Sequence, residues 1–134
     1  MAYNYFTEQD NIVRAYCRIT KNGISYDDAK YHFSFFKINK FKYDYGTKND
    51  NLLSVINNLK PFDRLYTIRL NDLGYQVKDI LYILSLLDDK YITLVVGIKE
   101  IDPRVAYKYI SDHFDENYFI NFNRYRLPIY KGDR

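Results

Sequence analysis

The sequence is short of the residues that cross-link a chain or hold a metal. It has one cysteine, Cys17, and two histidines, His32 and His113. One cysteine cannot close an intramolecular disulfide, and this set matches none of the usual zinc-binding spacings. Neither histidine stands with an Asp or Ser in a recognisable catalytic pattern, so we interpret both as ordinary surface or helix residues. We therefore expect an intracellular protein without a metal or another cofactor.

Long apolar runs and glycine-rich turns are also missing. No segment approaches the roughly 18–20 apolar residues that a membrane-spanning helix needs. The opening MAYNYFTEQD lacks the basic and apolar regions of a signal peptide. The segment KNG, residues 21–23, holds one glycine where a phosphate-binding loop needs several. These absences predict a cytoplasmic protein that does not enter a membrane.

What the chain does contain fits one globular domain. Its 134 residues are 47% hydrophobic and 28% charged, which suits a single continuous core. The net charge of +3 is small. A domain that contacts phosphates usually concentrates its basic residues on one face, so this charge alone indicates no nucleic-acid partner.

Strand-like and helix-like patterns alternate along the sequence. We predict strands within residues 11–20, 40–45, 63–70 and 91–98, and helices within 25–36, 50–59, 77–87 and 102–114. This alternation predicts an α/β domain of three layers, with a mostly parallel sheet of four to five strands flanked by helices. We expect the domain to span residues 11–115, between an N-terminal extension (1–10) and an aromatic, basic tail (116–134).

Two helix starts carry local signals. Ser25 precedes a helical pattern with Asp28 three residues later, which is a variant of the capping box. Asp102 followed by Pro103 is typical of an N-cap with proline at the first helical position.

Polar residues gather where two of the predicted strands end. Open α/β sheets place ligand sites at the carboxyl ends of their strands. The first strand ends in YCRIT, which puts Tyr16, Arg18 and Thr20 on one side because alternate residues share a face. The third strand ends in RLNDLGYQ, residues 69–76, so we expect these two segments to form the site.

Arg18 is the most informative of these residues, because a guanidinium inside an apolar strand must find an acceptor. One interpretation pairs it with Asp63 or Asp72, since buried charges are usually paired. The other is a phosphate-binding site formed by Arg18 and Lys48. A hydroxyl such as that of Thr20 more often bonds a turn backbone than attacks a substrate.

These segments resemble a known family. YCRITKNGISYDDA, residues 16–29, is similar to the opening of the catalytic domain of the resolvase/invertase family of serine recombinases: Tyr, any residue, Arg, Val, Ser, Thr, then Gln and a Leu-Asp-x-Gln helix start. Segments similar to the family's Arg-x-Gly-Leu helix, Gly-Asp-x-Leu strand, Leu-Asp-Arg-Leu-Gly-Arg turn, long helix and next strand follow in order. The resemblance covers residues 12–102 and implies the family's α/β fold.

The resemblance also implies a chemistry. Family members attack a DNA phosphodiester with the motif Ser and form a phosphoserine link, while arginines neutralise the developing charge. Tyr16, Arg18 and Asp63 match the family pattern. The position of the nucleophile holds Thr20, whose methyl group restricts its rotamers and crowds in-line attack.

Other positions depart from the pattern. Ile24 and Ala29 replace the two family glutamines, and Asn49, beside Lys48, replaces the arginine that opens the second helix. The family's Asp-Arg-Leu-Gly-Arg turn is here Asn71, Asp72, Leu73, Gly74 and Tyr75. Both arginines of that turn are gone, and one position has reversed charge. Because each lost oxyanion donor costs on the order of 10²- to 10³-fold in rate, we expect strand cleavage to be abolished.

We therefore predict a catalytically inactive, resolvase-like pseudoenzyme with a regulatory or binding role, acting on a protein partner or as a homodimer. Nothing in the last twenty residues resembles the family's helix-turn-helix DNA reader. One alternative is a DNA-binding or recombination accessory protein. Its phosphate contacts would be Lys37, Lys40, Lys42, Arg124, Arg126 and Lys131. A further alternative is an active site-specific recombinase that uses Thr20.

Overall fold

The computed structural model describes residues 12–118. The N-terminal extension expected at residues 1–10 and most of the expected tail lie outside the described residues. The same holds for three of the basic residues of the DNA-binding alternative, namely Arg124, Arg126 and Lys131.

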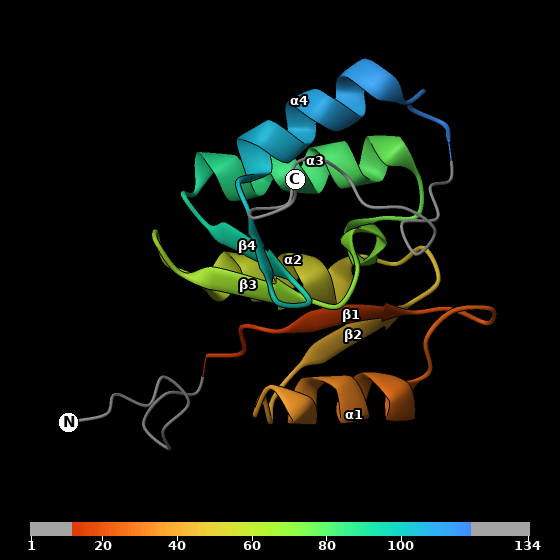
Figure 1. The fold of residues 1–134 in the computed structure, drawn as a ribbon, viewed down its shortest axis with the longest axis vertical. Helices are drawn as coiled ribbons and strands as arrows, with labels where there is room; N and C mark the ends of the chain where they lie inside the picture. The colour runs from red at the N-terminus through yellow and green to blue at the C-terminus, as the bar shows by residue number, and fades with distance from the viewer. Residues whose placement is uncertain (1–11, 119–134) are drawn as a thin grey trace.

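Strands and helices alternate along the chain, and the mixed α/β class is confirmed (Figure 1). In order, the elements are β1 (Tyr16–Ile19), α1 (Tyr26–Phe35), β2 (Lys42–Tyr45), α2 (Asp50–Asn58), β3 (Arg64–Thr67), the 3-10 helix η1 (Leu70–Leu73), α3 (Val77–Asp89), β4 (Thr93–Val96), β5 (Lys99–Ile101) and α4 (Pro103–His113). The four predicted strands and four predicted helices are all present within or close to their expected ranges. The short elements η1 and β5 were not predicted separately.

The strands form two sheets, so the expected single sheet of four to five strands is not confirmed. One sheet pairs β1 with β2 in parallel. The other has the order β3-β4-β5, in which β3 and β4 are parallel and β5 is antiparallel to β4. One isolated parallel bridge, Ala15 with Tyr66, links β1 to β3, and there the Tyr66 amide donates to the Arg14 carbonyl at 2.8 Å.

The pairing of β1 with β3 stops at this bridge for a physical reason. In a parallel ladder, every second amide of each strand donates to the neighbouring strand. The next amides in this pattern are those of Arg18 and Ile68, but both donate to the Asp72 carboxylate, at 3.1 Å and 2.9 Å. The carboxylate of Asp72 therefore accepts hydrogen bonds from two amides that would otherwise bond the neighbouring strand.

Helices cover the strands on opposite sides, as Figure 1 shows. Helix α1 lies below β1 and β2, where Ala29 and Phe33 pack on Ala15 and Cys17. Helices α2 and α3 pack on the other side around a larger apolar cluster, and α4 lies against α3. The carboxyl ends of β1 and β3 lie between these layers, beside η1.

Both predicted helix starts are confirmed. The Asp28 amide donates to the Ser25 hydroxyl at 3.1 Å, and the Ser25 amide donates back to the Asp28 carboxylate at 3.4 Å. The Asp102 carboxylate accepts from the Arg104 amide at 2.9 Å, and Pro103 opens α4. Within residues 12–118, no helix combines the length and the apolar character that crossing a bilayer requires.

Candidate functional site

A cavity of about 360 Å³ lies at the carboxyl ends of β1 and β3, where the sequence predicts the site. It is lined by Arg18, Thr20, Lys21, Asn22, Arg69, Asn71, Gly74 and Tyr75. The two segments YCRIT and RLNDLGYQ therefore do meet in space, because β1 and η1 pack against each other. The structure brings together four of the predicted site residues around this cavity: Arg18, Thr20, Asn71 and Tyr75.

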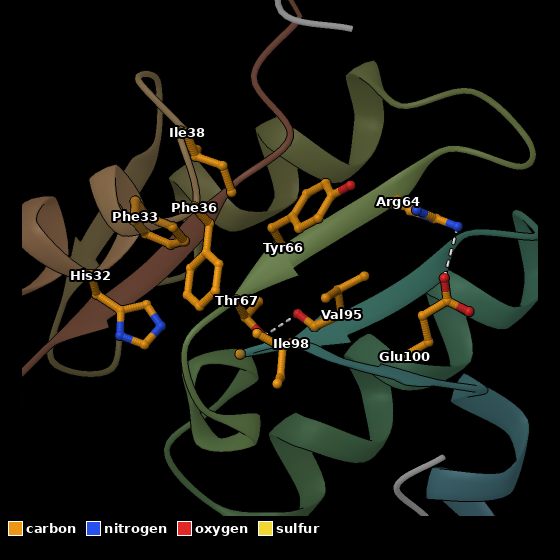
Figure 2. A pocket seen from close by; sticks show the side chains of 11 residues that line it. His32, Phe33, Phe36, Ile38, Arg64, Tyr66, Thr67, Val95, Ile98 and Glu100 are labelled. Carbon is orange, nitrogen blue, oxygen red and sulfur yellow. Dashed lines mark hydrogen bonds and ion pairs between the residues drawn. The ribbon is translucent and has the colours of Figure 1, made fainter. Parts of the chain in front are cut away.

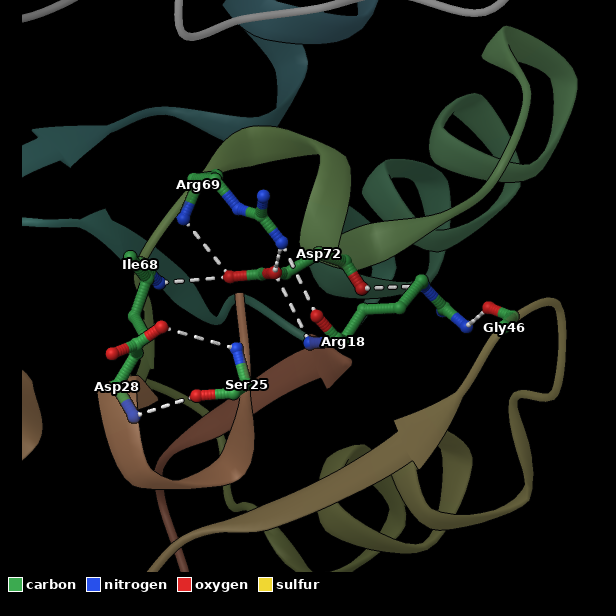
Figure 3. A network of polar contacts seen from close by, with 7 residues as sticks. All are labelled: Arg18, Ser25, Asp28, Gly46, Ile68, Arg69 and Asp72. Carbon is green, nitrogen blue, oxygen red and sulfur yellow. Dashed lines mark hydrogen bonds and ion pairs between the residues drawn. The ribbon is translucent and has the colours of Figure 1, made fainter. Parts of the chain in front are cut away.

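Asp72 lies beneath the cavity with no exposed surface. Its Oδ1 accepts from the Arg18 amide at 3.1 Å and from Nη2 of Arg69 at 3.3 Å. Its Oδ2 accepts from the amides of Ile68 and Arg69, each at 2.9 Å. Figure 3 shows these donors converging on the carboxylate from both sides. An ionised carboxylate, which only accepts hydrogen bonds, fits such a ring of donors.

Two opposing effects act on the ionisation of Asp72. Complete burial raises the pKa of its carboxyl above the ordinary value, because the charged form loses its hydration. The Arg69 guanidinium and the amides of Arg69, Arg18 and Ile68 lower the pKa and so oppose that rise. Every hydrogen bond to Asp72 stabilises its charged form, so the surrounding structure is built to hold an anion that belongs to the chain itself.

The guanidinium of Arg18 is held by oxygen atoms of two segments, η1 and the β2–α2 loop, and the residue is almost completely buried. Its Nε donates to the Asp72 carbonyl at 3.2 Å, and its Nη1 donates to the carbonyls of Gly46, at 2.8 Å, and Lys48. Its Nη2 donates to Oδ1 of Asn49. These acceptors are neutral, so Arg18 ties the β2–α2 loop to η1 and does not form an ion pair with a carboxylate through these bonds.

Tyr16 and Asp44 also use their polar groups for hydrogen bonds within the chain. The Tyr16 hydroxyl donates to Oδ2 of Asp44 at 2.8 Å. The same carboxylate accepts from the amides of Asn51 at 3.1 Å and Leu52 at 3.0 Å, which open α2. Burial raises the pKa of the Tyr16 phenol far above its usual value. Tyr16 thus supports the start of α2 through Asp44 and stays protonated.

Thr20 reaches the cavity, where no carboxylate or imidazole lies beside it. A Cβ built on Gly23 would lie 2.3 Å from Oγ1 of Thr20, so the hydroxyl packs directly against the backbone of the following turn. That turn is closed by the Gly23 amide, which donates to the Thr20 carbonyl at 3.2 Å. None of the residues that line the cavity is a His, Asp or Glu. The titratable side chains of the lining are Arg18, Lys21, Arg69 and Tyr75, so no imidazole or carboxylate stands in the cavity beside the hydroxyl.

Some of the predicted residues lie apart from the cavity. Asp63 stands before β3, at the opposite end of the strand from Arg69, where its carboxylate accepts the Lys60 amide at 2.8 Å. Lys48 is exposed, and among the contacts described only its backbone carbonyl reaches the site. Ala29 is fully buried on the face of α1 that packs on β1, and Ile24 packs on the same cluster. The phosphate site proposed at Arg18 and Lys48 stays a prediction.

Sequence reasoning missed two residues of this network. Arg69 forms an ion pair with Asp72 at 3.3 Å, and its Nε is buried without a hydrogen-bond partner. The three-residue spacing between Arg69 and Asp72 was the signal available for it. Asp44 is the buried residue of β2, and its carboxylate bonds Tyr16 and the start of α2. A carboxylate in a short alternating strand just before a helix was the signal for its capping role.

Comparison with known proteins identifies no family. No family model matches the chain, and no curated protein matches it significantly. Within residues 12–118, no three His, Cys, Asp or Glu side chains converge in a way that would hold a metal ion. The resemblance to serine recombinases therefore rests on the quoted residues and their order along the chain.

Proposed function

We propose that this chain is a catalytically inactive, resolvase-like domain that acts by binding a protein partner or a second copy of itself. The observation that carries the proposal is the Asp72 carboxylate, buried between β1 and β3 and bonded by four donors of the chain. The resemblance places a phosphate-binding arginine at this position. A carboxylate in its place repels a phosphate instead of attracting one.

The remaining groups fit the same proposal. Phosphodiester cleavage without a metal needs guanidinium groups directed at the transition state. Four of the N–H bonds of Arg18 are directed at oxygens of the chain. Thr20 adds a methyl group beside the expected point of attack. The site therefore keeps the shape of a strand-end pocket, and two of its cationic residues, Arg18 and Arg69, are bonded to oxygens of the chain.

The sheets support a finer proposal about the fold. We infer that β1–β2 and β3–β4–β5 correspond to one mostly parallel sheet that is interrupted between β1 and β3. The Ala15–Tyr66 bridge and the insertion of Asp72 next to it support this inference. A binding role is supported by exposed apolar side chains near the end of α1, where Tyr31 and Phe35 are about three-quarters exposed at 74% and 75%.

A DNA assay tests the loss of chemistry. Purified protein is incubated with supercoiled plasmid, and the products are denatured and examined for nicks and for protein covalently attached to DNA. We expect neither product from the wild type or from Thr20→Ala. A covalent adduct formed by the wild type and missing from Thr20→Ala would refute the proposal, because it would identify Thr20 as a working nucleophile. Sedimentation of the same preparation tests self-association.

One observation favours the DNA-binding alternative. Lys37, Lys40 and Lys42 are exposed and lie within six residues of one another, in the segment that follows α1 and at the first residue of β2. A gel-shift titration at several salt concentrations separates the two proposals. Affinity that falls steeply as salt rises would favour phosphate contacts by such lysines, whereas no shift favours a protein partner.

A further inference from the structure

A second cavity, of about 260 Å³, lies on the side of β3, β4 and β5 that α1 leaves uncovered. Figure 2 shows it between the end of α1 and the turn that joins β4 to β5. Its lining residues are His32, Phe33, Phe36, Ile38, Arg64, Tyr66, Thr67, Val95, Gly97, Ile98 and Glu100. None of these belongs to the cavity at the carboxyl ends of β1 and β3, so the two sites are separate.

The walls of this cavity are largely apolar and partly aromatic. Phe33 and Phe36 come from the end of α1, and Val95 and Ile98 face them from β4 and its turn (Figure 2). Aromatic side chains pack well against other flat rings in offset or edge-on arrangements. Pockets for drug-sized ligands usually measure about 300–1,000 Å³, so this smaller cavity suits a molecule with a single ring.

One hydrogen-bonding group in the cavity has no partner. Nε2 of His32 is buried and forms no hydrogen bond in the described structure. In Figure 2 the outer edge of the imidazole is turned toward Thr67 and Ile98. The Thr67 hydroxyl donates to the Val95 carbonyl at 3.2 Å, so its proton is already used. A buried polar atom without a partner is uncommon and unfavourable, so a ligand that bonds to it would gain affinity.

The charged groups at the rim are already neutralised. Nη2 of Arg64 and Oε2 of Glu100 form an ion pair at 2.7 Å. Burial lowers the pKa of His32 and so favours its neutral form. The cavity therefore presents aromatic walls and one neutral hydrogen-bonding nitrogen, and it offers no net charge that would select an ionic ligand.

We propose that this cavity binds a small single-ring aromatic molecule that carries a hydroxyl group, with the ring against Phe36 and the hydroxyl bonded to Nε2 of His32. A phenol hydroxyl both donates and accepts, so it matches either tautomer of the neutral imidazole. This site goes beyond the proposed function, and it does not depend on whether Thr20 can cleave DNA.

The experiment compares p-cresol with toluene, which has the same ring and methyl group but lacks the hydroxyl. Each is titrated into the full-length labelled protein while NMR follows the methyl groups of Val95 and Ile98. We expect saturable shifts with both compounds and a dissociation constant roughly fivefold lower for p-cresol, which corresponds to one hydrogen bond. In His32→Phe, p-cresol should bind no more tightly than toluene.

A matched control uses the other histidine. His113 lies at the end of α4, in the layer farthest from α1 (Figure 1), so His113→Phe should keep the wild-type preference for p-cresol. The proposal is wrong if neither compound shifts the methyl groups of Val95 and Ile98. It is also wrong if the preference for p-cresol survives in His32→Phe.

A direct measurement on the wild type covers the case in which His32→Phe does not fold. The ¹⁵N resonance of His32 Nε2 should shift when p-cresol is added and should stay in place when toluene is added. An unmoved resonance at saturating p-cresol would overturn the assignment of His32. These results are independent of the DNA assay, so failure here and failure of the proposed function can be told apart.

Discussion

At the scale of single residues, most of the polar groups that suggested a site bond to the chain itself. Arg18 was expected to need an acceptor, and it is bonded to oxygens as that reasoning requires. The identity of those acceptors was not predictable. Backbone carbonyls of Gly46 and Lys48 carry no signal in the sequence, and only the folded β2–α2 loop brings them to the guanidinium.

The environment of His32 could not be predicted from the residues around it in the sequence. His32 was interpreted as an ordinary surface or helix residue because it forms no recognisable catalytic pattern with an Asp or Ser in the sequence. Its environment is set by Phe36 on its own helix, with ring centroids 5.5 Å apart, and by strands that lie thirty or more positions later. A lone histidine becomes informative only when the fold shows which of its atoms are buried.

The pH dependence of stability should report the environment of His32. Burial lowers the pKa of the folded state below the ordinary 6.5, so the unfolded chain binds the proton first as pH falls. The contribution of neutral His32 is therefore present above pH 6.5 and is lost progressively below it. Urea unfolding between pH 7.5 and 5.5 should show a steeper loss for the wild type than for His32→Phe. Equal slopes would contradict a lowered pKa of His32 in the folded state.

At the scale of elements, the predictions that succeeded depend on short-range signals. The capping box of Ser25 and Asp28, and the start of α4 at Asp102 and Pro103, are complete within four residues of sequence. The elements that were missed, η1 and β5, have four and three residues. Strands β1 to β4 are equally short, with four residues each, but each lies within a longer strand-like run of the sequence. The segments of η1 and β5 have no such run of their own, so pattern reasoning does not detect them.

The capping box gives a prediction for α1. Ser25→Ala removes the acceptor of the Asp28 amide and should lower the free energy of unfolding by about 1 kcal/mol. Ser34→Ala is a matched control in the same helix, because its exposed hydroxyl bonds only the Tyr31 carbonyl among the contacts described. We expect this control to stay within about 0.5 kcal/mol of the wild type. Denaturant titrations followed by circular dichroism measure both, and equal losses would argue against the cap.

At the scale of the whole molecule, the α/β class followed from the alternation of apolar patterns, but the division into two sheets did not. From the sequence, Asp72 was interpreted either as the replacement of an arginine in the family pattern or as an ion-pair partner of Arg18. In the structure it fills the gap between β1 and β3 and joins the two sheets through the amides of Arg18 and Ile68. That role depends on a contact between residues 54 positions apart, which no local pattern reveals.

The free energy of unfolding of Asp72→Asn tests this role of Asp72 most directly. In either orientation, the amide group would turn N–H donors toward two donors that now bond a carboxylate oxygen. We expect a loss of about 3 kcal/mol or more. Asp79→Asn is the control, since Asp79 accepts from the Gln76 amide at 3.2 Å at the start of α3, and it should lose about 1 kcal/mol or less. If both variants lost less than about 1 kcal/mol in urea titrations, Asp72 would not be the residue that joins the two sheets.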